Sequence, residues 1–261
     1  MGERPTKALT EVMTEISPGI TRMCVENGEW SFGPPNYYLV QGIDSAVVVD
    51  SGTGTDEEFG LFRRTWLSKG KPQIAAVIVT HEHFDHDGGS FDFSDLVGAP
   101  IIGGLGKRAD ERTIDLGERA VTILPTPGHT EDSLCVMDNN TRGLFTGDTI
   151  IEDKSVVVED MGEYVNSLEA LKKLNPSTIL PGHGNQISDA EQKIADYIAR
   201  THRRERMILR FIHHGLNSVD SLTKRMYPHK PYVGQKQVLS HIEKLIEEGR
   251  VVEQEGQLVL I

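Results

Sequence analysis

The feature that most constrains this chain is a dense cluster of metal-type ligands directly after an apolar segment. Residues 74–80 are almost entirely apolar, which predicts a strand that is buried on both faces. The next six residues carry four side chains that can bind a metal, namely His81, His83, Asp85 and His86. One histidine alone is more often structural, but four ligand-type groups at a strand end indicate a metal site. Imidazole and carboxylate ligands suit zinc, iron or manganese.

Three further segments repeat this arrangement of an apolar run, a glycine and one ligand-type side chain. They place His129 after residues 120–124, Asp148 after 143–146 and His183 after 178–180. The glycines allow the backbone to approach closely. Because loops at one edge of a sheet converge, we expect all these side chains in one site. Seven ligand-type groups exceed the four that a structural zinc takes, which argues against a single structural metal.

The spacing of apolar residues predicts a layered α/β domain up to about residue 188. The expected strands are 37–40, 46–50, 74–80, 120–124, 133–137, 143–146 and 178–180, and the expected helices are 56–69 and 163–174. Within 163–174 the apolar positions follow a helical period, so we expect Tyr164 on a buried helix face rather than at a substrate.

The pattern changes after Gly184. Three helices are expected at 189–213, 218–227 and 235–249, followed by a hairpin over 251–261. Helices followed by a hairpin at the end of a chain are typical of a small winged-helix module. We therefore expect a catalytic domain over residues 1–188 and a linker helix with a winged-helix-like domain over 189–261.

Composition limits the class of protein. A formal net charge of −12 favours solubility and argues against binding of nucleic acid or acidic membrane by the whole surface. Cys24 and Cys135 are not in a CxxC pair, so we expect two reduced, buried thiols and no zinc–thiolate site. No apolar stretch approaches the ~20 residues of a membrane span. We expect a cytoplasmic protein, with a mitochondrial location open for a eukaryotic host.

The order of the motifs HxHxDH, GHT, TGD and PGHG resembles the metallo-β-lactamase superfamily over residues 15–188. The resemblance implies an αββα sandwich with two zinc ions, iron or manganese being alternatives. It assigns His81, His83 and His129 to one metal, Asp85, His86 and His183 to the other, and Asp148 to a bridge between them. Asp50 matches an aspartate that supports the ligands from behind.

The mechanism that the resemblance implies is hydrolysis. Two cations about 3.5–4 Å apart lower the pKa of a bridging water, and the resulting hydroxide attacks a carbonyl or phosphorus centre. Asp85 would orient this hydroxide and Asp148 would hold both metals, which makes these two the expected catalytic carboxylates.

The rest of the chain resembles one branch of this superfamily. Residues 156–174, the PGHG motif, the segment 189–206 and the appended module look like beta-lactamase-like protein 2. This resemblance implies zinc-dependent endonucleolytic cleavage of single-stranded RNA. Some fungal relatives act as thioesterases, so the alternative is a hydrolase of a small thioester, ester or lactone. Residues 149–154 lack the Gly-Cys-Gly-Arg-like segment of glyoxalase II and persulfide dioxygenases, which weighs against both.

A third hypothesis, a nucleic-acid-binding protein with a vestigial site, conflicts with the intact ligand set.

Two segments, 26–35 and 103–112, depart from the pattern of the animal beta-lactamase-like protein 2 sequences. Both are expected to border the mouth of the site and therefore to influence the choice of substrate.

One segment bears on RNA through its charge. Residues 200–236 hold nine Lys or Arg against two acidic residues, within an acidic chain. Such a segment can follow a phosphate backbone, and Arg203, Arg204 and Arg206 are the candidate RNA contacts. The alternative is a solvated helix face whose arginines pack against the catalytic domain. The sequence leaves both open.

Overall fold

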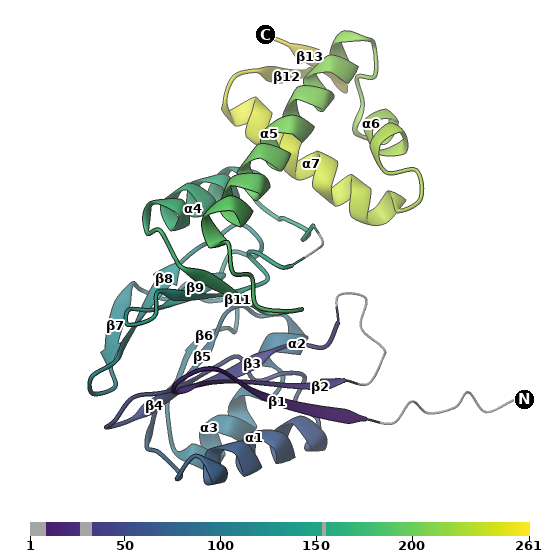
Figure 1. The fold of residues 1–261 in the computed structure, drawn as a ribbon. Helices are drawn as coiled ribbons and strands as arrows, with labels where there is room; N and C mark the ends of the chain where they lie inside the picture. The colour runs from purple at the N-terminus through teal and green to yellow at the C-terminus, as the bar shows by residue number, and fades with distance from the viewer. Residues whose placement is uncertain (1–8, 27–32, 153–154) are drawn as a thin grey trace, which may run out of the picture.

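The computed structural model describes residues 9–26, 33–152 and 155–261 (Figure 1). Two stacked sheets lie between two layers of helices. The first sheet has the order β1 (Thr10–Ser17), β2 (Ile20–Glu26), β3 (Tyr37–Gln41), β4 (Ala46–Val49), β5 (Ile74–Val79), β6 (Ile101–Gly103). The second has the order β11 (Thr178–Pro181), β10 (Gly143–Gly147), β9 (Leu134–Asp138), β8 (Ala120–Pro125), β7 (Arg112–Asp115). This architecture confirms the expected αββα class.

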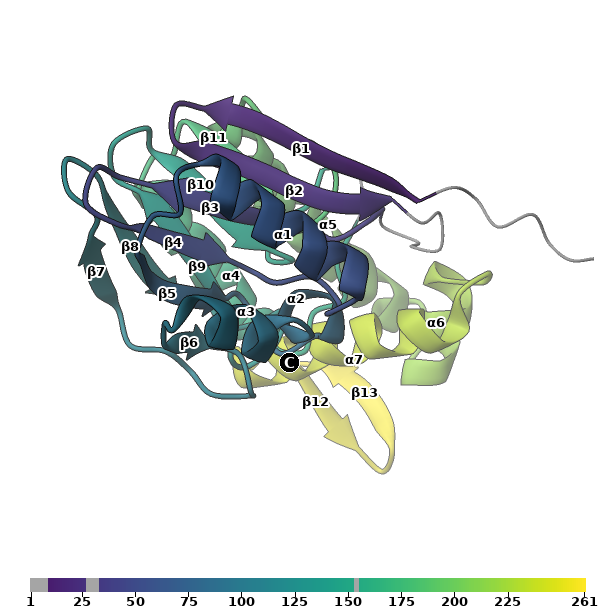
Figure 2. The same cartoon turned by 90° about the horizontal axis from the view of Figure 1, so that it is seen from below.

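The helices cover the outer faces of the sheets. α1 (Asp56–Ser68) and α3 (Ser90–Val97) pack on the first sheet, and α4 (Met161–Lys173) and α5 (Ala190–His213) pack on the second. The short helix α2 (Phe84–Asp87) lies at the end of β5 and carries part of the ligand cluster. Figure 2 shows the same layers from below, with α1 and α3 nearest the viewer.

The inner strands β3, β4 and β5 are apolar on both faces because each of them separates two cores. In β3, Tyr38 and Val40 face the second sheet, whereas Tyr37 and Leu39 face α1 and α3. The ring of Tyr38 meets the ring of Phe145 on β10 edge-on, at 5.0 Å between centroids. This contact joins the inner faces of the two sheets.

The long helix α5 belongs to two cores. Its first half packs Ile194 and Tyr197 against the second sheet and α4. Its second half packs Ile208 and Ile212 against α6 (Val219–Met226), α7 (Pro231–Glu247), β12 (Val251–Gln254) and β13 (Gln257–Leu260). The C-terminal elements thus have a hydrophobic core of their own, which α5 joins to the sandwich. α7 packs on α4 as well, and its Gln237 side chain donates to the Val156 carbonyl at 2.6 Å.

Several elements differ from the expectations. Strands β1, β2, β6 and β7 and helices α2 and α3 were not predicted, since β1 and β7 are mostly exposed edge strands without an apolar run. Helix α7 begins four residues earlier than expected, because Pro231 takes the first helical position where its missing N–H costs nothing. No helix in the described ranges is long and apolar enough to cross a membrane.

Candidate metal centre

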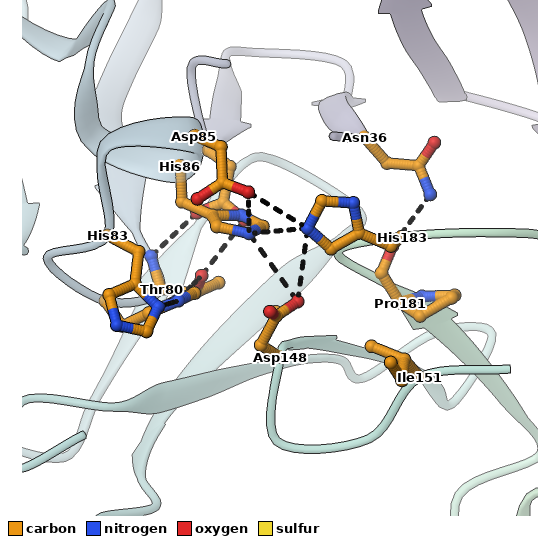
Figure 3. A network of polar contacts seen from close by, with 12 residues as sticks. Asn36, Thr80, His83, Asp85, His86, Asp148, Ile151, Pro181 and His183 are labelled. Carbon is orange, nitrogen blue, oxygen red and sulfur yellow. Dashed lines mark hydrogen bonds and ion pairs between the residues drawn. The ribbon is translucent and has the colours of Figure 1, made fainter. Parts of the chain in front are cut away.

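All seven predicted ligands meet at one edge of the sandwich, and Figure 3 labels five of them, His83, Asp85, His86, Asp148 and His183. His81 follows β5, His83 occupies the N-cap position of α2, and Asp85 and His86 lie within α2. The other three come from the second sheet, with His129 after β8, Asp148 directly after β10 and His183 just past β11. Both sheets therefore contribute ligands to the same edge of the sandwich, which local sequence alone does not dictate.

The first group contains His81, His83, His129 and Asp148. The Nε2 atom of His81 lies 2.9 Å from Nδ1 of His83, and Nε2 of His129 lies 3.2 Å from the same Nδ1. Three ring nitrogens thus converge on one point. His81 and His129 are buried and His83 is exposed, so the group opens to solvent at His83.

The second group contains Asp85, His86 and His183. The Nε2 atoms of His86 and His183 are 3.3 Å apart, and Oδ2 of Asp85 lies 3.2 Å from Nε2 of His183. The Asp85 side chain is 22% exposed and the two histidines are buried. Asp85 is therefore the member of this group that faces an incoming molecule.

Asp148 faces both groups. Its Oδ1 lies 3.5 Å from Nε2 of His86 and 3.6 Å from Nε2 of His183, while its Oδ2 lies 4.0 Å from Nε2 of His129. Burial alone would raise the pKa of this carboxyl, but the neighbouring His86 and then His183 and His81 outweigh burial and hold the pKa well below its usual range. Asp148 is therefore a carboxylate with one oxygen toward each group, as a bridging ligand requires.

Outer hydrogen bonds orient the rings. Nδ1 of His86 pairs with Oδ2 of Asp50 at 3.0 Å, and the other carboxylate oxygen of Asp50 accepts from the Thr80 backbone N–H at 2.7 Å. Nδ1 of His129 contacts the Val157 carbonyl at 2.6 Å, and Nδ1 of His183 contacts the Gly33 carbonyl at 2.9 Å. In each case Nδ1 faces an acceptor oxygen and carries a proton, so Nε2 is the ring nitrogen that points inward.

The electrostatics of the buried rings differ. Burial, followed by the charges of His86 and His129, lowers the pKa of His81 well below its usual value. Burial opposes protonation of His86 as well, but Asp50 and Asp148 outweigh it and raise the pKa of His86 well above its usual value. His81 is thus a neutral ligand donor, whereas His86 must release a proton before its Nε2 can bind a cation.

The residues fit a pair of metal ions. Ring nitrogens at 2.9–3.3 Å from one another converge in each group, and deprotonated inward nitrogens of this kind can share one cation. The buried Oδ1 of Asp148 has no hydrogen-bond partner among the described residues. A buried carboxylate oxygen without a partner is costly, and a cation would satisfy it. The nitrogen and oxygen donor set suits zinc.

The loop that carries His183 is held by residues whose roles the sequence did not reveal. The Asn36 side chain donates to the carbonyls of Pro181 and Gly184, both at 2.9 Å, and the Tyr38 hydroxyl donates to the Pro181 carbonyl at 2.7 Å. A Cβ at Gly182 would meet Cε1 of His86 at 2.6 Å, so only glycine lets this loop come so close. The sequence signal that could have revealed this role is a polar residue, Asn36, directly before a buried strand.

Of the two segments expected at the mouth, 26–35 contacts a predicted ligand where it is described, and 103–112 contacts a residue near one in sequence. Residues 27–32 of the segment 26–35 lie outside the described residues, but Gly33 holds His183 as stated above. In the segment 103–112, Arg108 donates to both carboxylate oxygens of Glu163 at 2.8–2.9 Å and lies 3.7 Å from Glu131, two residues beyond His129.

The predicted RNA contacts separate into two kinds. Arg203 and Arg206 are exposed on α5. Arg204 is half-buried and donates to Oγ of Ser155 at 3.0 Å, so it packs toward the catalytic domain. Tyr164 is buried, and its hydroxyl donates to the Thr149 carbonyl at 2.6 Å.

Comparisons with known sequences agree with this architecture. The family model of the Metallo-beta-lactamase superfamily matches residues 30–109 and 103–183. A beta-lactamase-like protein 2 homolog from Caenorhabditis elegans is 29% identical, covering 95% of this chain and 90% of the relative. An atrochrysone carboxyl ACP thioesterase from Aspergillus fumigatus is 30% identical, covering 74% of this chain and 65% of the relative.

Solved structures share the whole fold. A metallo-beta-lactamase family protein from Thermus thermophilus superposes with a TM-score of 0.77 at 19% identity, covering 95% of this chain and 100% of that one. A beta-lactamase domain protein from Burkholderia ambifaria gives 0.79 at 16% identity, covering 95% and 93%. Coverage of 95% means that the likeness includes most of the C-terminal elements.

Proposed function

The chain belongs to the metallo-β-lactamase superfamily, and from that premise we propose that it is a two-zinc hydrolase that cleaves a thioester. The observation that carries the two-metal hydrolase is the pair of ligand groups that face Asp148 from either side. The choice of a thioester is supported by the similarity to a fungal ACP thioesterase.

Zinc ions bound there would lower the pKa of a water molecule and polarise the substrate's carbonyl oxygen. Asp148 and the six other ligands would bind the two cations. Asp50 keeps His86 in the orientation in which its Nε2 points inward. Asp85 is more exposed than Asp148, at 22% against 13%, and can take a proton from the attacking water at Oδ1 or Oδ2. As the C–S bond breaks, that proton can pass to the departing thiolate, giving an acid and a thiol.

Cleavage of single-stranded RNA is the second candidate, and its support is the basic segment 200–236. Arg203 and Arg206 of this segment are exposed. Figures 1 and 2 both place the turn between α6 and α7 on the same side of the molecule as α2, which carries metal-type ligands. A phosphate backbone lying along this side would meet both the basic segment and the candidate metal centre.

The C-terminal region has a proposed role as well. We propose that residues 189–261 act as a winged-helix-like module, with α5 as the linker helix. The support is the order of α6, α7 and the β12–β13 hairpin around a separate hydrophobic core.

The experiment that tests the proposal combines metal analysis with two assays on the same preparation. We expect about two zinc ions per chain, turnover of an acyl thioester, and slow or no cleavage of unstructured RNA. Efficient RNA cleavage with no thioester turnover would replace the first candidate with the second. A single tightly held iron with oxygen consumption would contradict both.

A further inference from the structure

Two arginines of α5 point at one hydroxyl group. Arg200 donates from Nη1 to Oγ of Ser155 at 3.1 Å, and Arg204 donates from Nη2 to the same oxygen at 3.0 Å. They are four residues apart, so their side chains lie on one face of the helix. Within the described ranges neither guanidinium forms an ion pair with a carboxylate.

Among the described residues, no carboxylate pairs with either of these two arginines. Two cations that share a neutral oxygen repel each other, and half-buried charges are normally paired. The next residue, Glu205, could have served, but it is buried and pairs with Lys244 on α7 at 2.9 Å. The two arginines therefore have donor capacity for an anion that the described part of the chain does not itself supply.

The surroundings strengthen the attraction for an anion. The guanidiniums border a small cavity, about 10 Å³, whose other walls include Tyr164, Tyr197 and Met161. Such a volume admits about one water-sized atom, so one oxygen of an anion would be enclosed while the rest faced solvent. Arg200 lies over the ring of Tyr197 at 5.1 Å, which fixes the direction of its planar fork.

The cavity is linked to the candidate metal centre by the chain itself. The Tyr197 hydroxyl contacts both the N–H and the carbonyl of Ile151, and the Tyr164 hydroxyl holds the Thr149 carbonyl. Thr149 and Ile151 follow Asp148 closely in the chain, and Figure 3 shows Ile151 beside Asp148. An anion at the arginines would thus lie just behind the loop that leaves the metal centre.

We propose that Arg200, Arg204 and Ser155 bind one phosphate group of the substrate. Guanidinium forks match the geometry of phosphate oxygens, and the Ser155 hydroxyl can turn to donate to the same group. The source of the phosphate rests on the proposed function. For a thioesterase it is the phosphate-bearing thiol carrier, as in coenzyme A or a phosphopantetheine arm.

The first test measures binding without turnover. Inorganic phosphate is titrated into the zinc-loaded full-length protein by calorimetry, alongside the Arg200→Gln/Arg204→Gln double variant. Phosphate bound at the metals is common to both proteins, so the difference reports the arginines. We expect the variant to lose roughly tenfold to a hundredfold in affinity for the arginine-dependent phosphate, as loss of hydrogen bonds to a charged group implies.

A matched control is Arg210→Gln, an exposed arginine further along α5. It should bind phosphate as the unmodified protein does. If the double variant binds phosphate normally and only melts at a lower temperature, the arginines are a structural clamp and the proposal is wrong. Arg200→Lys gives a second check, because a clamp tolerates lysine whereas a bidentate phosphate contact does not.

The second test identifies the source of the phosphate. The double variant should show a KM for an acyl-coenzyme A that is raised about tenfold with kcat unchanged, and an unchanged KM for the same acyl group on phosphate-free N-acetylcysteamine. Equal effects on the two thioesters would overturn the site. If neither thioester is turned over but RNA cleavage depends on the two arginines, the site stands, the phosphate is that of RNA, and the proposed thioesterase function is the part that fails.

Discussion

Asp148 is the single residue on which both halves of the candidate metal centre depend, because each of its oxygens faces a different group of histidines. The other six ligands belong to one group only. It lies directly after β10, and its side chain is 13% exposed.

Replacing Asp148 with Ala should therefore remove at least one of the two expected zinc ions and nearly all activity. The physical reason is that the converging histidine nitrogens would lose the negative charge that balances two cations. Zinc counted by mass spectrometry of the native protein checks this. Asp95→Ala, an exposed carboxylate on α3, should retain both ions. Full zinc content in Asp148→Ala would contradict a bridging role.

A second prediction concerns Asn36, which positions the loop that carries His183. Asn36→Ala removes the donors that the carbonyls of Pro181 and Gly184 accept, so the loop of His183 should loosen. We expect a loss of about 1–3 kcal/mol in the free energy of unfolding and weaker binding of one zinc ion. Chemical denaturation and a zinc-chelator competition measure the two effects. Asn139→Ala, on an exposed turn, serves as the comparison, and identical behaviour of the two variants would remove the role from Asn36.

At the scale of elements, α5 is the helix that joins the two cores. It begins after the predicted boundary at residue 188, yet its first half completes the core of the catalytic domain with Ala190, Ile194 and Tyr197. The boundary in sequence is therefore not a boundary in packing. A chain cut after Asn185 should expose the apolar faces of α4 and of the second sheet and should aggregate. Expression followed by gel filtration tests this, and a soluble monomer with the melting temperature of the full chain would contradict it.

A further prediction concerns the positive charge on the exposed face of α5 and its effect on RNA binding. Arg203→Gln with Arg206→Gln should weaken RNA binding and flatten its salt dependence if RNA is the substrate, since each phosphate contact adds about −0.7 to the log–log slope. Arg204 is left intact because it contacts Ser155. Fluorescence anisotropy with a single-stranded RNA at several salt concentrations measures the slope. Lys172→Gln with Lys173→Gln, on the exposed end of α4, controls for net charge. An unchanged slope would assign Arg203 and Arg206 to a solvated face.

For the whole molecule, His241 makes stability depend on pH. It lies fully buried on α7, among Glu205, Lys244 and Arg204, and neither ring nitrogen has a hydrogen-bond partner among the described residues. Burial, followed by the charge of Arg204, lowers the pKa of His241 to about 4. Between its ordinary pKa of about 6.5 and that value, the unfolded chain binds a proton that the folded chain does not. The free energy of unfolding should therefore fall by about 3 kcal/mol as the pH drops through this window.

Urea denaturation at pH 7 and at pH 4.5 measures this loss. Many carboxylates also contribute in acid, so the informative quantity is the difference from His241→Phe, which keeps an aromatic ring without a titrating group. The variant should lose distinctly less stability than the unmodified protein over the same range. If the two lose equal amounts, His241 binds no proton on unfolding in this window.

The family and the sandwich could be predicted from the sequence because the signals are local. An apolar run as short and as rich in β-branched residues as 74–80 favours an inner strand that is buried on both faces, and ligand-type residues at its end then lie at the sheet edge. The motif order from His81 to His183 then indicated the superfamily, and the family match confirms that prediction. The roles of the individual ligands stay predictions.

The tertiary structure alone decided how distant segments meet. That Asp148 faces two groups, that Asn36 braces the loop of His183, and that α5 serves two cores all depend on contacts between residues far apart in the chain. The same holds for the basic segment, where the sequence predicted one charged stretch. Packing separates it into an exposed pair, Arg203 and Arg206, and an inward pair, Arg200 and Arg204. The physical reason is that composition fixes how much charge a helix carries, whereas only the neighbouring elements determine which face of that helix meets solvent.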